Sequence, residues 1–144
     1  PRDWSSDVCS SDLSVERGFV KGVIDVLFRV DEKFFVLDWK SDQLPAWDAA
    51  SVQRHVERNY ALQAELYVLA TVKHLGIADA EDYERRFGGV VYAFVRAMVE
   101  PDQGDERDER DGRERGRVVT RPRYEDVLRW EATLRARREF ARVS

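Results

Sequence analysis

The 144-residue chain contains little cysteine, histidine and lysine, and it has no long apolar run. Its single cysteine, Cys9, cannot form an internal disulfide, which fits a reducing compartment. No stretch approaches the roughly 20 apolar residues of a membrane-spanning helix, and the first residues lack the pattern of a signal peptide. We therefore expect a cytoplasmic protein without a membrane partner.

The histidines and the net charge argue against two further classes of protein, zinc proteins with histidine ligands and non-specific nucleic-acid coat proteins. His55 and His74 belong to no HxxxH pattern and no CxxC pattern is present, so a histidine-ligated zinc site is unsupported and we expect both histidines at the surface. The net charge of −4 opposes a protein that coats nucleic acid non-specifically. A chain of this length, with 43% hydrophobic residues, is expected to form one domain with a modest core.

Two segments are set apart from this domain. Residues 1–13 show neither a helical nor a strand period and resemble the translation of a sequencing adapter, so we expect them to be non-native. Residues 101–117 are rich in Asp, Glu and Arg and contain no apolar residue, so we expect a disordered charged loop. The remaining domain would span residues 14–144.

Two apolar runs, residues 18–30 and 33–40, have the composition of strands and flank Asp31-Glu32 as a plausible reversal. A hairpin turning there would place Asp25 opposite Asp38, with Cβ atoms about 4.5–5.5 Å apart. Like charges that face each other in a strand pair are unfavourable. A divalent cation between the two carboxylates would explain why a hydrophobic hairpin builds such a pair.

Alternation along the second run puts Lys40 on the same face as Asp38, which we expect to be the more polar face of the hairpin. Two carboxylates and a backbone carbonyl suit Mg²⁺, which retains several waters and can activate one of them. A nearby lysine can orient that water or stabilise charge that develops on a phosphate. Surface carboxylates with Lys40 simply paired to Asp38 are the alternative, and the second aspartate within an apolar run favours the functional interpretation.

The rest of the chain predicts alternating helices and strands. Residues 49–75 are helical in character up to Gly76, and an acidic segment at 79–86 predicts another helical turn. Residues 90–95 predict a buried strand, residues 118–120 a short strand and residues 123–142 a last helix. On the long helix, Tyr60, Gln63 and Tyr67 share one stripe, which could face a phosphate or form an amphipathic edge.

These motifs together resemble the nuclease domain of the RecB family, within the PD-(D/E)xK nuclease superfamily. The resemblance is carried by four segments: Glu16 to Asp25, Leu37 to Ser41, Tyr60 to Tyr67 and Arg86 to Arg96. Thr120-Arg121-Pro122 before the last helix also fits. The implied fold is α/β, a restriction-endonuclease-like mixed central sheet flanked by helices, here without its N-terminal helix.

The resemblance also implies roles for individual residues. Asp25, Asp38 and the carbonyl of Trp39 would bind Mg²⁺, and Lys40 would be the catalytic lysine. Gln63 and Tyr67 match the family's QxxxY motif, which lies beside the active site. The family's metal-ligating histidine comes from an upstream helix, and no residue of this chain corresponds to it. We therefore expect this fragment alone to be a weak or inactive nuclease.

The function implied is that of a Mg²⁺-dependent deoxyribonuclease of the exodeoxyribonuclease V type, acting in bacterial double-strand break repair and recombination. Its partners would be DNA and RecC-like and RecD-like subunits, and ATP would be used only by a helicase region outside this chain. Two alternatives remain open: an AddA- or Cas4-like nuclease, and a non-catalytic module that docks on other subunits.

Overall fold

The computed structural model describes residues 14–16, 19–99 and 115–143. The segment expected to be non-native, residues 1–13, lies outside the described residues. So does most of the charged loop expected at 101–117, of which only residues 115–117 are described.

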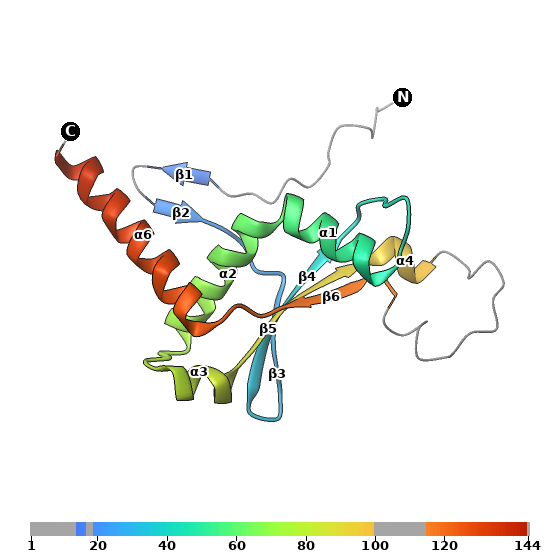
Figure 1. Ribbon diagram of the computed structural model, residues 1–144, viewed down its shortest axis with the longest axis horizontal. Helices are drawn as coiled ribbons and strands as arrows, with labels where there is room; N and C mark the ends of the chain where they lie inside the picture. The colour runs from blue at the N-terminus through green and yellow to red at the C-terminus, as the bar shows by residue number, and fades with distance from the viewer. Residues whose placement is uncertain (1–13, 17–18, 100–114, 144) are drawn as a thin grey trace.

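The centre of the fold is a mixed four-stranded sheet (Figure 1). Its strands, in spatial order, are β3 (Val26–Val30), β4 (Lys33–Lys40), β5 (Phe87–Phe94) and β6 (Arg117–Thr120). The pairs β3–β4 and β5–β6 are antiparallel, whereas β4 and β5 are parallel. A parallel pair needs a long crossover, which the helices between β4 and β5 provide. The predicted mixed sheet flanked by helices is confirmed.

The predicted hairpin register is confirmed, but the first strand is shorter than expected. Val26 pairs with Leu37 and Phe28 with Phe35, and Asp31 takes a positive φ of 53° at the reversal. The sequence predicted one strand over residues 18–30. Instead the chain leaves strand geometry between Gly22 and Asp25, and β2 (Phe19–Lys21) pairs with β1 (Ser14–Glu16) in a separate two-stranded sheet.

The single helix predicted for residues 49–75 is two helices, α1 (Ala49–Asn59) and α2 (Ala61–His74). The break falls at Tyr60, whose φ of −124° and ψ of 9° are not helical. Its side chain is held by contacts outside the helix, described below, so tertiary contacts override helix propensity at this residue. Gly76, with φ of 63°, ends α2 as predicted.

The remaining elements are α3 (Ala80–Arg86), α4 (Val95–Val99) and α6 (Tyr124–Val143). The predicted turn at 79–86, the strand at 118–120 and the last helix are confirmed. The sequence did not predict α4: Val95 was assigned to the buried strand, but that strand ends at Phe94. None of the described helices is long and apolar enough to cross a membrane.

The two faces of the sheet have different surroundings. α1 contacts β6 and α2 contacts β5, so these helices lie along one face (Figure 1). Val36, Val90 and Phe94 point to this covered face and are buried. On the other face, Trp39 and Val119 are 47% and 54% exposed. The even-numbered side of β4, which also carries Asp38 and Lys40, is therefore the core side.

Candidate active site

Asp38 and Lys40 form a buried ion pair on the covered face of β4. Their relative exposures are only 3% and 7%, and Lys40 Nζ lies 2.7 Å from Asp38 Oδ2. Removing two charges from water is costly unless they are paired and hydrogen-bonded. The prediction that the two side chains share a face is confirmed, but the face is the interior of the domain rather than an exposed polar surface.

Gln63 and Tyr67 of α2 complete the hydrogen bonds of this pair. Lys40 Nζ donates to Gln63 Oε1 at 2.9 Å, and Gln63 Nε2 donates to the Tyr67 hydroxyl at 2.9 Å. The Tyr67 hydroxyl lies 3.0 Å from Asp38 Oδ1 and 2.7 Å from the Val23 carbonyl. Their spacing of four residues places both side chains on one side of α2. Both of these side chains are buried, whereas Tyr60, the third residue of the predicted stripe, is partly buried.

Burial fixes the protonation state of Tyr67. Loss of solvent, followed by the nearby carboxylate of Asp38, raises the pKa of Tyr67 well above its ordinary value. The hydroxyl therefore remains protonated near neutral pH and can donate to Asp38 or Val23. Because it reaches both β4 and the segment before β3, Tyr67 connects the two parts of the chain that carry the aspartates.

Asp25 lies just before β3, at the end of the hairpin ladder, and is exposed. Its Oδ2 accepts a hydrogen bond from the Trp39 backbone N at 3.0 Å. The sequence predicted that Asp25 lies opposite Asp38. The described ladder ends one pair earlier, at Val26 with Leu37, so Asp25 and Asp38 are not paired in it. The bond to Trp39 nevertheless brings the Asp25 carboxylate to the backbone between Asp38 and Lys40.

Aromatic rings surround the Lys40 ammonium. Nζ lies 3.9 Å from the ring centroid of Tyr60 and 5.6 Å from that of Tyr92. The two rings stack on each other, with centroids 5.6 Å apart. A cation over an aromatic face is attracted by the ring quadrupole, more strongly when both are shielded from water. The ammonium is thus held by Asp38, Gln63 and Tyr60 together.

Asp42, His55 and Tyr60 form a cluster that the sequence did not predict. Asp42 Oδ2 accepts from the Tyr60 hydroxyl and lies 2.7 Å from His55 Nε2. His55 was expected at the surface, but it is partly buried and its ring meets Phe94 edge-on at 5.7 Å. His74 is exposed as expected. No sequence spacing marks the cluster, because the break at Tyr60 brings it together.

The pKa values of Asp42 and Tyr60 in this cluster are shifted in opposite directions. Burial raises the pKa of the Asp42 carboxyl, but the hydrogen bonds from Tyr60 and His55 outweigh it, and the pKa lies below its usual value. Burial and the hydrogen bond to Asp42 raise the pKa of Tyr60 well above its ordinary value. Asp42 is therefore an acceptor near neutral pH, and Tyr60 is its donor.

Two carboxylates near this end of β4 are available to a hydrated divalent cation. Asp38 Oδ2 is buried and accepts no hydrogen bond from the described residues, although it faces the Lys40 ammonium. Asp25 leaves its carboxylate exposed at the same end of β4. Mg²⁺ is usually bound by one or two carboxylates together with waters. Within residues 14–16, 19–99 and 115–143, no group of three or more His, Cys, Asp or Glu could hold a metal.

A mixed sheet with a lysine and two aspartates at one strand end is the arrangement expected of a metal-dependent nuclease. The profile of the PD-(D/E)XK nuclease superfamily matches residues 3–142, and the chain belongs to this superfamily.

Within this superfamily, the chain is similar to one subunit of the RecBCD enzyme from several bacteria. The chain is 40% identical over 97 residues to the RecBCD enzyme subunit RecB of Escherichia coli (strain K12), a match covering 61% of this chain and 8% of that protein. The corresponding subunit of Haemophilus influenzae is 36% identical over 95 residues, covering 61% and 8%. The Mycolicibacterium smegmatis subunit is 33% identical over 93 residues, covering 57% and 9%. The matches thus span less than a tenth of each of these relatives.

Proposed function

We propose that this chain is the nuclease domain of a RecB-like helicase–nuclease and hydrolyses phosphodiester bonds in DNA with the help of Mg²⁺. The observation that carries the proposal is the buried Asp38–Lys40 pair, held by Gln63 and Tyr67 beside Asp25. A buried ion pair contributes little net stability. Its presence in the core is better explained by chemistry at the adjoining strand end.

Asp25, Asp38 and the Trp39 carbonyl are the proposed metal ligands. Bound there, a divalent cation would neutralise phosphate charge and lower the pKa of a water molecule. Lys40 would place a positive charge at the reacting phosphate, where it stabilises developing negative charge. Gln63 and Tyr67 would act by holding Lys40 and Asp38 in position.

We infer that cleavage by this chain alone is slow. The described residues supply two carboxylates but no third acidic or histidine ligand. Two carboxylates and a carbonyl should bind Mg²⁺ weakly, since affinity depends on the number and charge of the ligands.

The proposed partners are DNA and subunits like RecC and RecD. The named relatives are subunits of the RecBCD enzyme, which supports this interpretation over an AddA- or Cas4-like nuclease. The second alternative, a non-catalytic docking module, would have no use for a buried lysine and aspartate beside an exposed carboxylate.

Cleavage of linear DNA by the chain tests the proposal, with and without Mg²⁺. Asp25→Asn should abolish Mg²⁺-dependent cleavage without unfolding the domain, because Asp25 is exposed and asparagine can still accept from Trp39. Lys40→Gln should slow cleavage about 10²–10³-fold. Asp126→Asn, which removes a carboxylate paired with Arg129 on α6, is the control and should cut normally.

Calorimetric titration with Mg²⁺ gives a measurement independent of turnover. The unaltered chain should bind the ion, and Asp25→Asn should bind it more weakly than Asp126→Asn does. Cleavage that persists in Asp25→Asn and Lys40→Gln, both shown to be folded by circular dichroism, would refute the proposed site.

A further inference from the structure

A second feature lies beside the proposed active site, on the outer side of α1. A hollow of about 220 Å³ is bounded by the loop after β4 and by one side of α1. Its lining residues are Leu44, Pro45, Ser51, Arg54, His55, Arg58 and Asn59. Two arginines spaced by four residues therefore lie at the same opening, since this spacing places them on one side of a helix.

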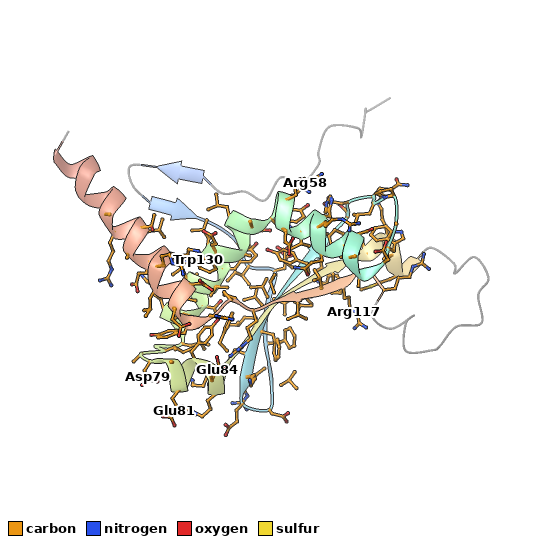
Figure 2. The ribbon with its side chains drawn as sticks, in the orientation of Figure 1. Arg58, Asp79, Glu81, Glu84, Arg117 and Trp130 are labelled. Carbon is orange, nitrogen blue, oxygen red and sulfur yellow. The ribbon has the colours of Figure 1, made fainter. Side chains whose placement is uncertain are left out.

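The charge of these two arginines is not neutralised within the described part of the chain. Arg54 donates to the Ser51 hydroxyl at 3.1 Å, and neither Arg54 nor Arg58 has a carboxylate within ion-pair distance there. Asp48 is close enough to Arg54 to feel its charge, but its carboxylate accepts from the Ser51 backbone N as the cap of α1. Figure 2 shows Arg58 on α1.

Four other arginines on described helices have carboxylate partners, whereas Arg96 on α4 donates to the Ser41 carbonyl. Arg85 and Arg86 pair with Asp82, Arg129 pairs with Asp126 and Arg135 pairs with Glu131. On an acidic protein, two guanidinium groups that face a hollow without such partners form a local positive site.

The hollow is connected to the proposed active site through His55. This residue lines the hollow, pairs with Asp42 at 2.7 Å and contacts the Tyr60 ring, with centroids 5.9 Å apart. The Tyr60 ring in turn lies against the Lys40 ammonium, which is 3.9 Å from the ring centroid. One partly buried histidine and one tyrosine thus separate the hollow from the lysine.

We propose that Arg54 and Arg58 form a binding site for a backbone phosphate of the DNA strand that enters the active site, away from the phosphate that is cleaved. Guanidinium groups bind phosphate oxygens through paired, charge-assisted hydrogen bonds. The Ser51 hydroxyl, which accepts from Arg54, adds a neutral donor to the lining of the hollow. The site would hold the strand through its backbone and would not read its sequence. This inference rests on the proposed nuclease function.

The experiment compares two double variants of the chain with equal charge. Arg54→Gln with Arg58→Gln removes the proposed contacts, and Arg129→Gln with Arg135→Gln removes two paired arginines on α6. Binding of a fluorescent single-stranded oligonucleotide is measured by anisotropy over a range of salt concentrations, in EDTA to prevent cleavage. Losing the contact to one phosphate should reduce the slope of log K against log salt by about 0.7.

We expect the Arg54/Arg58 variant to bind the oligonucleotide about tenfold more weakly at low salt, whereas the α6 variant should bind like the unaltered chain. With Mg²⁺, the Arg54/Arg58 variant should show a raised KM for DNA with little change in kcat, because the reacting groups are untouched. Equal affinities and salt slopes for the two double variants, or no binding by the unaltered chain, would overturn the proposal.

The two proposals fail separately. Cleavage by the unaltered chain that depends on Asp25 and Lys40, but is indifferent to Arg54 and Arg58, would remove only the phosphate site. If the two arginines instead bind an acidic protein partner, the Arg54/Arg58 variant should bind DNA as well as the unaltered chain does. That result would also overturn the phosphate site and leave the proposed nuclease function standing. Cleavage that is indifferent to Asp25 and Lys40 would instead remove the proposed function.

Discussion

Replacing Tyr67 by phenylalanine tests whether one hydroxyl group contributes both to the stability of the core and to the geometry of the proposed active site. The change leaves the ring in place and removes only the hydroxyl. That hydroxyl lies within hydrogen-bond distance of Asp38 Oδ1, Gln63 Nε2 and the Val23 carbonyl. Asp38 and Gln63 are buried and would lose a partner, whereas the Val23 carbonyl can be reached by water because Val23 is 66% exposed.

The expected magnitude follows from the two buried partners. A buried polar group left without a hydrogen bond costs about 1–3 kcal/mol. Two such groups predict a loss of about 2–6 kcal/mol in the free energy of unfolding of Tyr67→Phe. The carboxylate of Asp38 would also lose the contact that orients it, and a shift of about 1 Å at a reacting group can cost about 10²-fold in rate.

Tyr83→Phe is the matched control. Tyr83 is fully buried, and its hydroxyl donates to the Pro122 carbonyl at 2.9 Å, far along the chain from the site residues. Losing one neutral hydrogen bond should cost about 1 kcal/mol and leave cleavage unchanged. Urea unfolding and DNA cleavage are measured on both variants. If Tyr67→Phe is no less stable than Tyr83→Phe and cuts at the normal rate, the hydroxyl does not connect core and site.

Three further predictions concern the surroundings of the site. Tyr60→Phe keeps the aromatic ring next to Lys40 but removes the hydrogen bond to Asp42, so the free energy of unfolding should fall by about 1–2 kcal/mol. The cleavage rate should fall less than in Lys40→Gln, and equal losses of rate in the two variants would contradict this. Burial raises the pKa of Tyr83 to about 12 and that of Tyr67 still higher. Their contribution to stability is therefore fully present below pH 10 and is lost as the pH rises from 10 through the folded-state values. Ionisation of these two tyrosines, followed by tyrosinate absorbance, should accompany alkaline unfolding, and their ionisation before unfolding would refute this. Gly88→Ala should lower the free energy of unfolding by about 1–3 kcal/mol, because the added Cβ would lie 2.3 Å from the Phe35 ring. Thermal unfolding measures this, and an unchanged melting temperature would show that the ring can move aside.

Sequence patterns predicted the parts of the fold that local chemistry controls. Alternation and composition identified the β3–β4 register and the buried β5 strand, because side chains on a strand alternate between faces whatever lies above them. Gly76 was identified as a helix end because it alone can adopt the positive φ at no steric cost. The candidate residues Asp38 and Lys40 followed from the same alternation.

Contacts between distant residues account for the rest. The sequence gives no sign that the chain breaks at Tyr60, because Tyr60 is held there by Asp42 and by the ring of Tyr92. Nor could alternation show which face of β4 is covered, since that depends on where α2 lies. The side chains of Asp38 and Lys40 were therefore expected on a polar face, whereas they are in the core.

That burial changes how the site must be tested. Removing one member of a buried ion pair leaves the other charge without compensation, at a cost of about 3–5 kcal/mol. Asp38→Ala can therefore lose activity simply because the domain unfolds, and such a loss would say nothing about chemistry. Asp25 is exposed at the same end of β4 and can be changed without this cost. The exposed aspartate, rather than the buried one, is the residue whose substitution separates a role in catalysis from a role in folding.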